Sequence, residues 1–454
     1  MTINSAIFKG YDIRGIYPSE LNEENIVPII KAIYTNLLSS TIVVGTDMRT
    51  SSPTLTKVAI QTLVDLGAEV IDIGVVSTPT FYFAVYHYSY GAGMQITASH
   101  NPKEWNGIKI VKRREKGLIK IGKSTGLEKI KQMALSGESA GKTLGGTVTK
   151  KSGILEDEVE NALHIAGNPE IGTFKIVADA ANAMGSQYID ALFNKIPGEI
   201  VRMNFALDGT FPVHQPDPLQ KETLIDLQKR VVLEEADLGL APDGDGDRLF
   251  FLDEKGNIIP PTIITSIVAV ELLKKNSGEQ ILVDIRYLFT PQKIIAENGG
   301  KTGVTKVGHA YITEAMNQTG ALFAGESSAH YYFRETGNAE SQMPVILTVL
   351  KVLTEKGKPI SKIVEEYRRS FESGEFNFTV NDTKAILDDA VKQYNDGTLD
   401  TMDGIAISYP TWRFSLRSSI TEPLLRLNVE SYQKDVMEQK RDDLIQFIQH
   451  HDRS

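Results

Sequence analysis

The chain of 454 residues contains no cysteine. A disulfide framework, a thiolate zinc site and a thiol nucleophile are therefore excluded, and a reducing compartment is compatible with the sequence. The chain also lacks an apolar run of about 18 residues that would span a membrane. Its first residues show no basic segment followed by an apolar one, as a signal peptide would. We therefore expect a cytoplasmic protein with no membrane segment.

Positive charge is also scarce, because the formal net charge is -10. This balance argues against general nucleic-acid binding, which needs a basic face, although local Arg and Lys clusters can still bind small anions. Apolar residues make up 41% and charged residues 23% of the chain, which is typical of a soluble globular protein. A chain of this length is too long for one hydrophobic core, so we expect three or four domains.

Apolar segments that end in aspartate recur three times, at residues 42–47, 175–179 and 280–284. Small residues and a helix-compatible stretch follow each one. In residues 55–66 the apolar side chains are spaced by three and four, as on one face of a helix. Strand and helix in alternation predict α/β folding with parallel strands. We therefore expect three similar mixed α/β domains.

The pattern of apolar and polar residues changes after residue 373. Apolar residues alternate with polar ones around Phe376, Phe414 and Leu425, and helical patterns lie near 383–394 and 432–450. This predicts a C-terminal α+β domain with an antiparallel sheet. A Gly- and Ser-rich stretch at 136–142 reads as a linker, and residues 249–257 carry a hairpin signal that we assign to the start of the third domain. The predicted domains are residues 1–145, 146–249, 250–372 and 373–454.

Ser99 is the first candidate for chemistry. It lies in the stretch Thr-Ala-Ser-His-Asn-Pro at 97–102, after a strand-like segment, and Asn-Pro stops a helix from starting there. We expect an exposed serine at the tip of a tight loop, with His100 beside it. Most serines in such loops only form turns, so a nucleophilic or phosphorylated serine needs support from a second site.

That support comes from Asp243, Asp245 and Asp247, which are separated only by glycines. Carboxylates that alternate on a flexible loop can converge on one cation, and three hard oxygen ligands favour Mg²⁺. A plain acidic turn is one alternative. An EF-hand calcium loop is another, because Glu254 falls at its twelfth position. However, Arg248 stands where that loop needs glycine, and the following residues are strand-like.

Three further features are weaker when taken singly. Residues 417–421, Arg-Ser-Ser-Ile-Thr, combine a cation with hydroxyls and loop amides that suit a phosphate dianion, or else end a strand at the surface. Residues 325–330, Gly-Glu-Ser-Ser-Ala-His, can hydrogen-bond sugar hydroxyls, or else form a hairpin turn. His309 follows Val307 and Gly308 and is either a ligand-binding or simply a packed histidine.

The stretches at 97–102, 243–248, 325–330 and 417–423 occur in the order found in a known family. With them the chain resembles the α-D-phosphohexomutases, and is most similar to the phosphomannomutase/phosphoglucomutase branch. The resemblance covers nearly the full length, including residues 11–15 and 106–109.

The resemblance implies four domains around a central cleft, and each domain would contribute one loop to the active site. It implies a phosphorylated Ser99 and an Mg²⁺ held by Ser99, Asp243, Asp245 and Asp247. The remaining implied roles are proton transfer by Lys109 and His330, phosphate positioning by Arg14, His100 and Arg248, substrate binding by His309, Glu326 and Ser328, and a grip on the non-reacting phosphate by Arg417, Ser419 and Thr421. The implied activity interconverts hexose 1-phosphate and hexose 6-phosphate, with mannose or glucose as the sugar. A hexose 1,6-bisphosphate would act as intermediate and activator, in a monomer or small homo-oligomer.

Two positions depart from the family pattern, and other functions stay open. Ile420 replaces a residue that is Asn or Gly in many relatives, and Ala329 replaces a Gly. A phosphoglucosamine mutase is the nearest alternative, although residues 330–334 and 424–430 look more like a phosphomannomutase. A cation-dependent sugar-phosphate binding protein without turnover and a phosphatase that uses Ser99 are alternatives from other classes.

Overall fold

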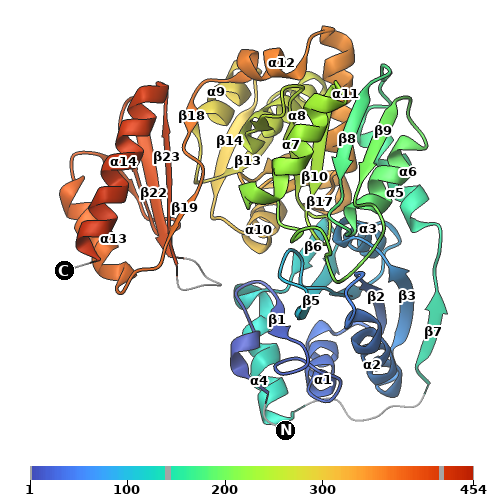
Figure 1. Ribbon diagram of the computed structural model, residues 1–454. Coiled ribbons are helices and arrows are strands. Elements are labelled where there is room, and N and C mark those ends of the chain that lie inside the picture. Colours follow the sequence, from blue (N-terminus) through green and yellow to red (C-terminus); the bar gives the residue numbers. More distant parts are fainter. Residues whose placement is uncertain (1–2, 139–144, 419–423, 453–454) are drawn as a thin grey trace.

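The computed structural model describes residues 3–138, 145–418 and 424–452. They form four β-sheets, each with helices packed on it (Figure 1). The sheet of the N-terminal domain lies at the bottom of the view, the next two sheets lie side by side above it, and the C-terminal domain stands to one side. No helix among the described residues is both long and apolar enough to cross a membrane. Three α/β units and one antiparallel domain confirm the predicted fold class.

The first sheet is mixed and has seven strands in the order β1-β5-β4-β2-β3-β7, with β6 on β5. Strands β4, β2, β3 and β7 run parallel, whereas β1, β5 and β6 are antiparallel to their partners. Helices α1, α2 and α4 pack on one face and α3 on the other. The bounds are β1 (Ile13–Ile16), α1 (Ile26–Leu37), β2 (Thr41–Thr46), α2 (Ser52–Asp65), β3 (Glu69–Val75), α3 (Thr78–His87), β4 (Ala92–Ile96), β5 (Trp105–Arg114), β6 (Gly117–Lys120), α4 (Glu128–Ser136) and β7 (Thr147–Lys150).

The second and third sheets share one hydrophobic core, which runs through the buried helices α8 and α11. Their strand orders are β12-β11-β10-β8-β9 and β14-β13-β15-β16-β17. The second unit comprises α5 (Ile154–Ala166), β8 (Lys175–Asp179), α6 (Gly185–Phe193), β9 (Glu199–Met203), α7 (Ile225–Leu233), β10 (Leu238–Pro242), β11 (Leu249–Leu252) and β12 (Ile258–Ile259). The third comprises α8 (Pro261–Lys275), β13 (Gln280–Asp284), α9 (Phe289–Glu297), β14 (Lys301–Thr305), α10 (His309–Thr319), β15 (Phe323–Gly325), β16 (Tyr331–Phe333), β17 (Ala339–Glu340), α11 (Met343–Lys356) and α12 (Ile360–Tyr367).

The fourth sheet is antiparallel, in the order β18-β23-β22-β21-β20 with β19 on β23. Alternate residues of β22 and β23 point into a core closed by α13 and α14, which is the pattern that period-two spacing predicts. The elements are β18 (Phe371–Glu372), β19 (Phe376–Phe378), α13 (Thr383–Gln393), β20 (Thr398–Asp400), β21 (Ile405–Ser408), β22 (Trp412–Ser418), β23 (Leu425–Ser431) and α14 (Lys434–His451).

The borders predicted from the sequence do not coincide with the borders of the sheets. Strand β7 lies beyond residue 145 but pairs with β3 of the first sheet. The hairpin predicted to open the third domain instead extends the second sheet, because β11 pairs with β10, so the border at 249–250 falls within β11. Strand β18 lies before residue 373 but pairs with β23. Side-chain alternation marks a strand but does not say which sheet it joins, and this is why these assignments were wrong. Part of the predicted linker, residues 139–142, lies outside the described residues.

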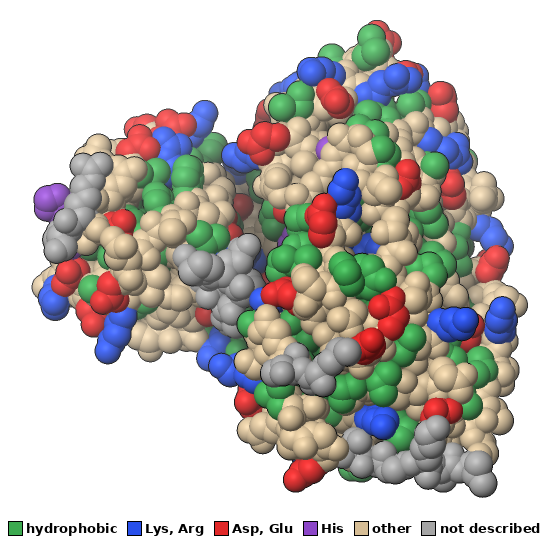
Figure 2. Space-filling model, turned by 60° about the horizontal axis from the view of Figure 1, so that its bottom comes forward, with side chains coloured by type: hydrophobic (Ala, Val, Ile, Leu, Met, Phe, Trp, Pro, Cys, Tyr) green, Lys and Arg blue, Asp and Glu red, His purple; other side chains and the backbone are tan. Residues whose placement is uncertain are grey.

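Three loops that carry predicted site residues follow the carboxyl ends of β4, β10 and β15. Direct contacts hold the domains that bear them. Buried Lys120 of the first domain pairs with Glu340 of the third. The amide of Asn317 also donates to the Leu118 carbonyl oxygen at 2.7 Å. The C-terminal domain is set apart by a groove (Figure 2). It is joined to the third through Arg413, which is buried and donates to the carbonyl oxygens of Ile285 and Arg286 at 2.8 and 2.9 Å.

Candidate active site

Ser99 lies in the loop that follows β4, in a left-handed backbone conformation with φ of 53°. Its amide donates to the Thr97 hydroxyl at 3.0 Å, which tightens the turn. The residue is only 2% exposed, so the prediction of an exposed loop tip was wrong. The second domain covers the loop: a Cβ on Gly244 would lie 2.3 Å from the Ser99 carbonyl oxygen. The loop is therefore a buried junction between two domains.

Arg49 hydrogen-bonds the backbone of this loop, although the sequence analysis assigned it no role. Its side chain is wholly buried and its Nε lies 3.2 Å from Asp47. The guanidinium donates to four backbone carbonyls of the serine loop, those of Ser99 (2.7 Å), Asn101 (2.6 Å), Pro102 (2.7 Å) and Trp105 (3.0 Å). A planar group with several fixed donors suits this task. Arg49 therefore defines the backbone path that carries Ser99.

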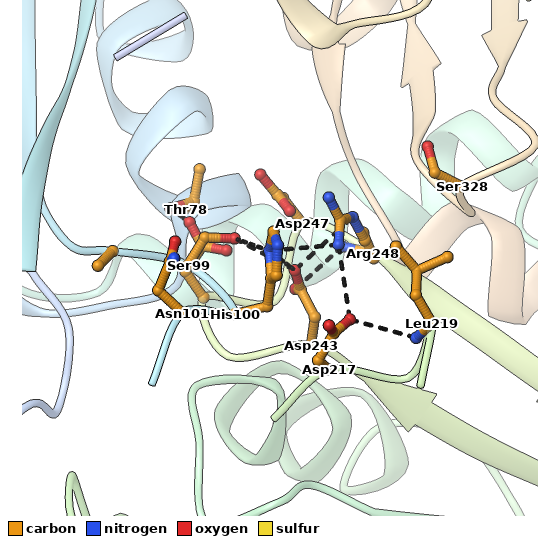
Figure 3. Close-up of polar contacts among 12 residues, drawn as sticks. Thr78, Ser99, His100, Asn101, Asp217, Leu219, Asp243, Asp247, Arg248 and Ser328 are labelled. Carbon is orange, nitrogen blue, oxygen red and sulfur yellow. Dashed lines mark hydrogen bonds and ion pairs between the residues drawn. The ribbon is translucent and has the colours of Figure 1, made fainter. Parts of the chain in front are cut away.

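The three aspartates of the second domain lie directly opposite Ser99. They follow β10 on a turn in which Gly246 takes a φ of 80°. The Ser99 hydroxyl donates to Asp243 Oδ2 at 3.3 Å (Figure 3). All three carboxylates are buried, and one oxygen from each lies within 4.8 Å of the others. The predicted cation-binding group is thus assembled beside the serine.

These carboxylates fit a divalent cation. Asp245 Oδ1 is buried without a hydrogen-bond partner, and burial together with Asp247 and Asp245 raises the pKa of Asp243 well above its usual value. A bound cation would relieve both costs. The EF-hand alternative does not fit, because strand β11 follows the aspartates at once and the Glu254 side chain accepts a hydrogen bond from the Ser361 amide at 3.1 Å.

Lys109, on β5, supplies positive charge to the same group. Its ammonium lies 2.6 Å from Asp245 and 2.5 Å from Asp247. Burial alone would lower the Lys109 pKa, but the two carboxylates raise it well above the ordinary value. Thr78 Oγ1 also donates to Asp245 at 2.6 Å. Lys109 therefore stays protonated and crosses the junction between the first and second domains.

His100 lies between Ser99 and Arg248 in Figure 3. His100 Nδ1 lies 3.1 Å from the Ser99 hydroxyl and 3.2 Å from Arg248 Nη1. Burial, Arg248 and Arg14 lower the pKa of His100 well below its usual value, so the ring is neutral and Nδ1 accepts. Arg14 pairs with Asp12 at 2.8 Å and hydrogen-bonds the Asn101 side chain. Three basic side chains thus surround the serine loop.

The third domain joins this cluster through His330. Its Nε2 lies 3.3 Å from Asp247 and its Nδ1 3.0 Å from Glu326. Although burial alone would lower the pKa of His330, these two carboxylates raise it to about 9. Arg248 Nε also lies 3.3 Å from Nε2, a contact that only the neutral ring can accept as a hydrogen bond. Ser328 Oγ lies 3.1 Å from His330 Nδ1, and Figure 3 places Ser328 farther from Ser99 than Arg248 is.

Arg286 and Glu375 connect the third domain to the fourth, and sequence reasoning missed both. Arg286 pairs with Asp284 at 2.9 Å and donates to the Ser328 hydroxyl at 3.2 Å. Its Nη1 lies 3.7 Å from Glu375, which in turn accepts from Arg417 at 2.9 Å. Arg417 is thus linked to the cluster through two further residues. Arginine or glutamate at such isolated positions carries no motif, so no local signal could have found them.

Of the described residues that were predicted for the site, His309 makes no hydrogen bond within this network. His309 begins α10 and packs against the Tyr11 ring with centroids 5.3 Å apart, and neither of its ring nitrogens has a hydrogen-bond partner. Burial lowers its pKa well below the usual value. Ser419 and Thr421, with Ile420 between them, lie outside the described residues. Ser99, His100, Lys109, Arg248, His330 and the three aspartates are brought together in one connected cluster.

A serine hydroxyl, three buried carboxylates that could hold a cation and converging basic groups, carried on loops of separate α/β domains, form the arrangement expected of an enzyme of the phosphohexomutase type. Residues 5–138, 157–256 and 260–370 match the models of phosphoglucomutase/phosphomannomutase α/β/α domains I, II and III. The chain belongs to the phosphoglucomutase/phosphomannomutase family of α-D-phosphohexomutases. The mutase activities for which this family is named are isomerase activities.

Individual relatives extend over the whole chain. A phosphomannomutase of Vibrio cholerae is 36% identical over 97% of this chain and 98% of its own. A crystal structure of a phosphoglucomutase/phosphomannomutase family protein from Burkholderia thailandensis matches with a TM-score of 0.88 and 28% identity, over 99% of this chain and 98% of that one. An N-acetylphosphoglucosamine mutase of Aspergillus fumigatus, solved with GlcNAc-6P and magnesium, shares the fold at a TM-score of 0.62 and 12% identity, over 99% and 96% of the two chains.

Proposed function

We propose that this protein interconverts hexose 1-phosphate and hexose 6-phosphate, with mannose or glucose as the sugar. The observation that carries the proposal is the 3.3 Å contact between the Ser99 hydroxyl and Asp243, within a cluster of three carboxylates and several cations. The name of the V. cholerae relative supports mannose as one substrate. In this proposal Ser99 carries a phosphoryl group in the working enzyme.

The reaction is two phosphoryl transfers of opposite direction. In the first, the free hydroxyl of a hexose 1-phosphate attacks the phosphorus on Ser99, the bond from phosphorus to Oγ breaks, and a hexose 1,6-bisphosphate forms. The intermediate then turns over and returns its other phosphoryl group to Ser99. The attacking hydroxyl loses one proton and Oγ gains one, so no proton is released overall. Lys109 and His330, which both lie beside the aspartates and start in the protonated form, are our candidates for transferring that proton.

The protein's contribution is mainly placement and charge. Asp243, Asp245, Asp247 and an oxygen on Ser99 would hold Mg²⁺, which when bound would act as a Lewis acid on the phosphoryl group. Arg14, His100 and Arg248 lie around the serine loop and would position the phosphoryl oxygens. Each of these groups is already held by buried partners before substrate arrives, which limits the reorganisation that transfer requires.

The sugar and its second phosphate would bind on the far side of His330. Glu326 and Ser328, which both contact His330, would hydrogen-bond sugar hydroxyls, together with His309 at the start of α10. Arg417, with Ser419 and Thr421, would grip the phosphate that is not reacting. Because the two ends of the substrate exchange places, the same grip must accept either phosphate.

The test is a panel of mannose, glucose and glucosamine 1-phosphates, assayed with Mg²⁺ and a catalytic amount of hexose 1,6-bisphosphate. We expect hexose 6-phosphate to form from mannose or glucose 1-phosphate, while little inorganic phosphate is released. Preference for the glucosamine ester would make the protein a phosphoglucosamine mutase. Steady release of inorganic phosphate would identify a phosphatase, and binding with no product would identify a binding protein. Intact mass after exposure to the bisphosphate should show one added phosphoryl group.

A further inference from the structure

A segment of the second domain, residues 208–217, lies against the serine loop, and no motif drew attention to it. It connects β9 to the short helical turn before α7. Phe211 lies beneath the Arg49 guanidinium, whose carbon is 5.1 Å from the ring centroid. A Cβ on Gly209 would lie 2.6 Å from the Arg49 Cα, so the two backbones are in close contact. The segment therefore covers the arginine that shapes the serine loop.

Residues 215–217 of this segment touch both reacting loops. Gln215 Nε2 donates to the His100 carbonyl oxygen at 2.9 Å, directly beside Ser99. The Pro216 carbonyl oxygen accepts from the Gly244 amide at 3.1 Å, within the aspartate loop. Asp217 lies 3.9 Å from Arg248 Nη1, as Figure 3 shows. Three consecutive residues thus contact the serine loop, the aspartate loop and the arginine between them.

The segment is anchored at His214. Its Nε2 lies 3.0 Å from Asp179, at the carboxyl end of β8, and its Nδ1 2.9 Å from the Gln215 carbonyl oxygen. Both neighbours are acceptors, so the doubly protonated ring can donate to each. Asp179 is itself fixed by the Ala181 amide at 3.0 Å and by Asn204 at 2.9 Å. The anchor therefore ties the segment to β8 of its own domain.

We propose that His214, Gln215 and Pro216 form a positioning element that sets the distance between Ser99 and Asp243. The inference rests on the proposed roles of those two residues. Gln215 fixes the serine loop and Pro216 fixes the aspartate loop to the same rigid three-residue unit. Neither is among the residues that we assign to the sugar or to the distal phosphate, so we expect the element to act on transfer rather than on substrate binding. A displacement of about 1 Å between reacting groups is enough to cost about 100-fold in rate.

The test compares Gln215→Leu and Gln215→Glu with Gln187→Leu. Gln187 offers a matched control, because its Nε2 also donates to a backbone carbonyl of the first domain, that of Val75 at 3.1 Å, and this carbonyl belongs to neither the serine loop nor the aspartate loop. We expect transfer from phosphorylated Ser99 to hexose 1-phosphate, followed by rapid quench, to slow about tenfold or more in both Gln215 variants, with KM changed by less than about twofold. Gln187→Leu should retain the wild-type rate.

Gln215→Glu keeps the shape of the side chain but replaces the amide donor with a charged carboxylate, so slower transfer in both Gln215 variants reports loss of the donor and not loss of side-chain volume. Wild-type transfer rates in the two Gln215 variants would overturn the inference, and so would a loss equal to that of Gln187→Leu. A rise in KM without slower transfer would overturn it as well. A failure of the proposed function can be distinguished from a failure of this inference. If the proposed function were wrong, Ser99→Ala would retain turnover, whatever the Gln215 variants do.

Discussion

The Ser99 hydroxyl lies 3.3 Å from the Asp243 carboxylate, although 144 positions separate the two residues in the chain. The contact joins the first domain to the second and places the serine hydroxyl, which carries the phosphoryl group in our proposal, beside three buried carboxylates. Such closeness is the geometry that phosphoryl transfer needs, because placement and charge neutralisation supply most of its catalysis.

Ser99→Ala should abolish turnover while leaving the fold intact. The variant removes only a hydroxyl whose partners, Asp243 and His100, remain otherwise satisfied. We expect no added phosphoryl mass after exposure to hexose 1,6-bisphosphate, and thermal unfolding close to that of the wild type. Ser39→Ala, a serine outside the cluster, should keep full activity. Turnover by folded Ser99→Ala protein would disprove the serine role.

Lys109→Met should destabilise the protein without Mg²⁺ by roughly 3 kcal/mol, because it leaves two buried carboxylates without their cation. Mg²⁺ should then recover part of the loss and stabilise this variant more than it stabilises the wild type. Urea unfolding with and without Mg²⁺ measures both effects, and Lys112→Met on the same strand is the control. An equal response of the two proteins to Mg²⁺ would show that the ion does not bind at these aspartates.

Arg417→Ala should raise the KM for hexose 1-phosphate about tenfold or more, with a smaller change in kcat. The reason is that a charge-assisted hydrogen bond to phosphate contributes about 1.5–3 kcal/mol. Steady-state kinetics at saturating bisphosphate measure the split between KM and kcat. Arg441→Ala, on the exposed face of α14, should behave as the wild type. An unchanged KM would remove Arg417 from the phosphate grip.

Glu158→Gln should stabilise the protein above pH 7. Burial raises the pKa of Glu158 to about 7, against a hydrogen bond from Thr80 Oγ1 at 2.6 Å that lowers it. Because the folded pKa is raised, the stability contributed by Glu158 is full below pH 4.5 and is lost as the pH rises through 7. The neutral amide avoids that loss.

The stability gain of Glu158→Gln should therefore be near zero at pH 4.5 and reach on the order of 3 kcal/mol at pH 8. Urea unfolding at both pH values gives the difference. Glu160→Gln, exposed on the same helix, should show no such trend. A gain that is the same at pH 4.5 and pH 8 would mean that the Glu158 carboxyl is not titrating in this range.

Candidate site residues that belong to a short sequence motif were predictable, whereas single residues that contact another loop or domain were not. Ser99 and the aspartates belong to local patterns whose spacing suggests chemistry. Arg49, Arg286 and Gln215 stand in ordinary surroundings, and the contacts that give them a role, to Ser99, Ser328 and His100, span 50, 42 and 115 positions. Their roles arise only when the chain brings distant loops together.

The dependence on contacts between distant segments also explains why the exposure of Ser99 was wrongly predicted. Loop residues with small polar neighbours usually face solvent, so Ser99 was expected at the surface. Its burial depends on the Asp loop and on residues 208–217 closing over it, which no feature of residues 97–102 reveals. The order of strand and helix in the α/β units and the alternation in the last sheet were predictable, because each depends on the periodicity of its own residues.

The strands β7 and β18, which complete sheets beyond the apparent domain borders, bear on any attempt to dissect the molecule. A fragment that stops at residue 145 loses the edge strand of its sheet, and one that begins at residue 373 loses another, so self-sufficient pieces should extend through Lys150 or start at Phe371. Neither piece would hold both Ser99 and Asp243. The fragments that should fold on their own are therefore not fragments that would contain a complete active site.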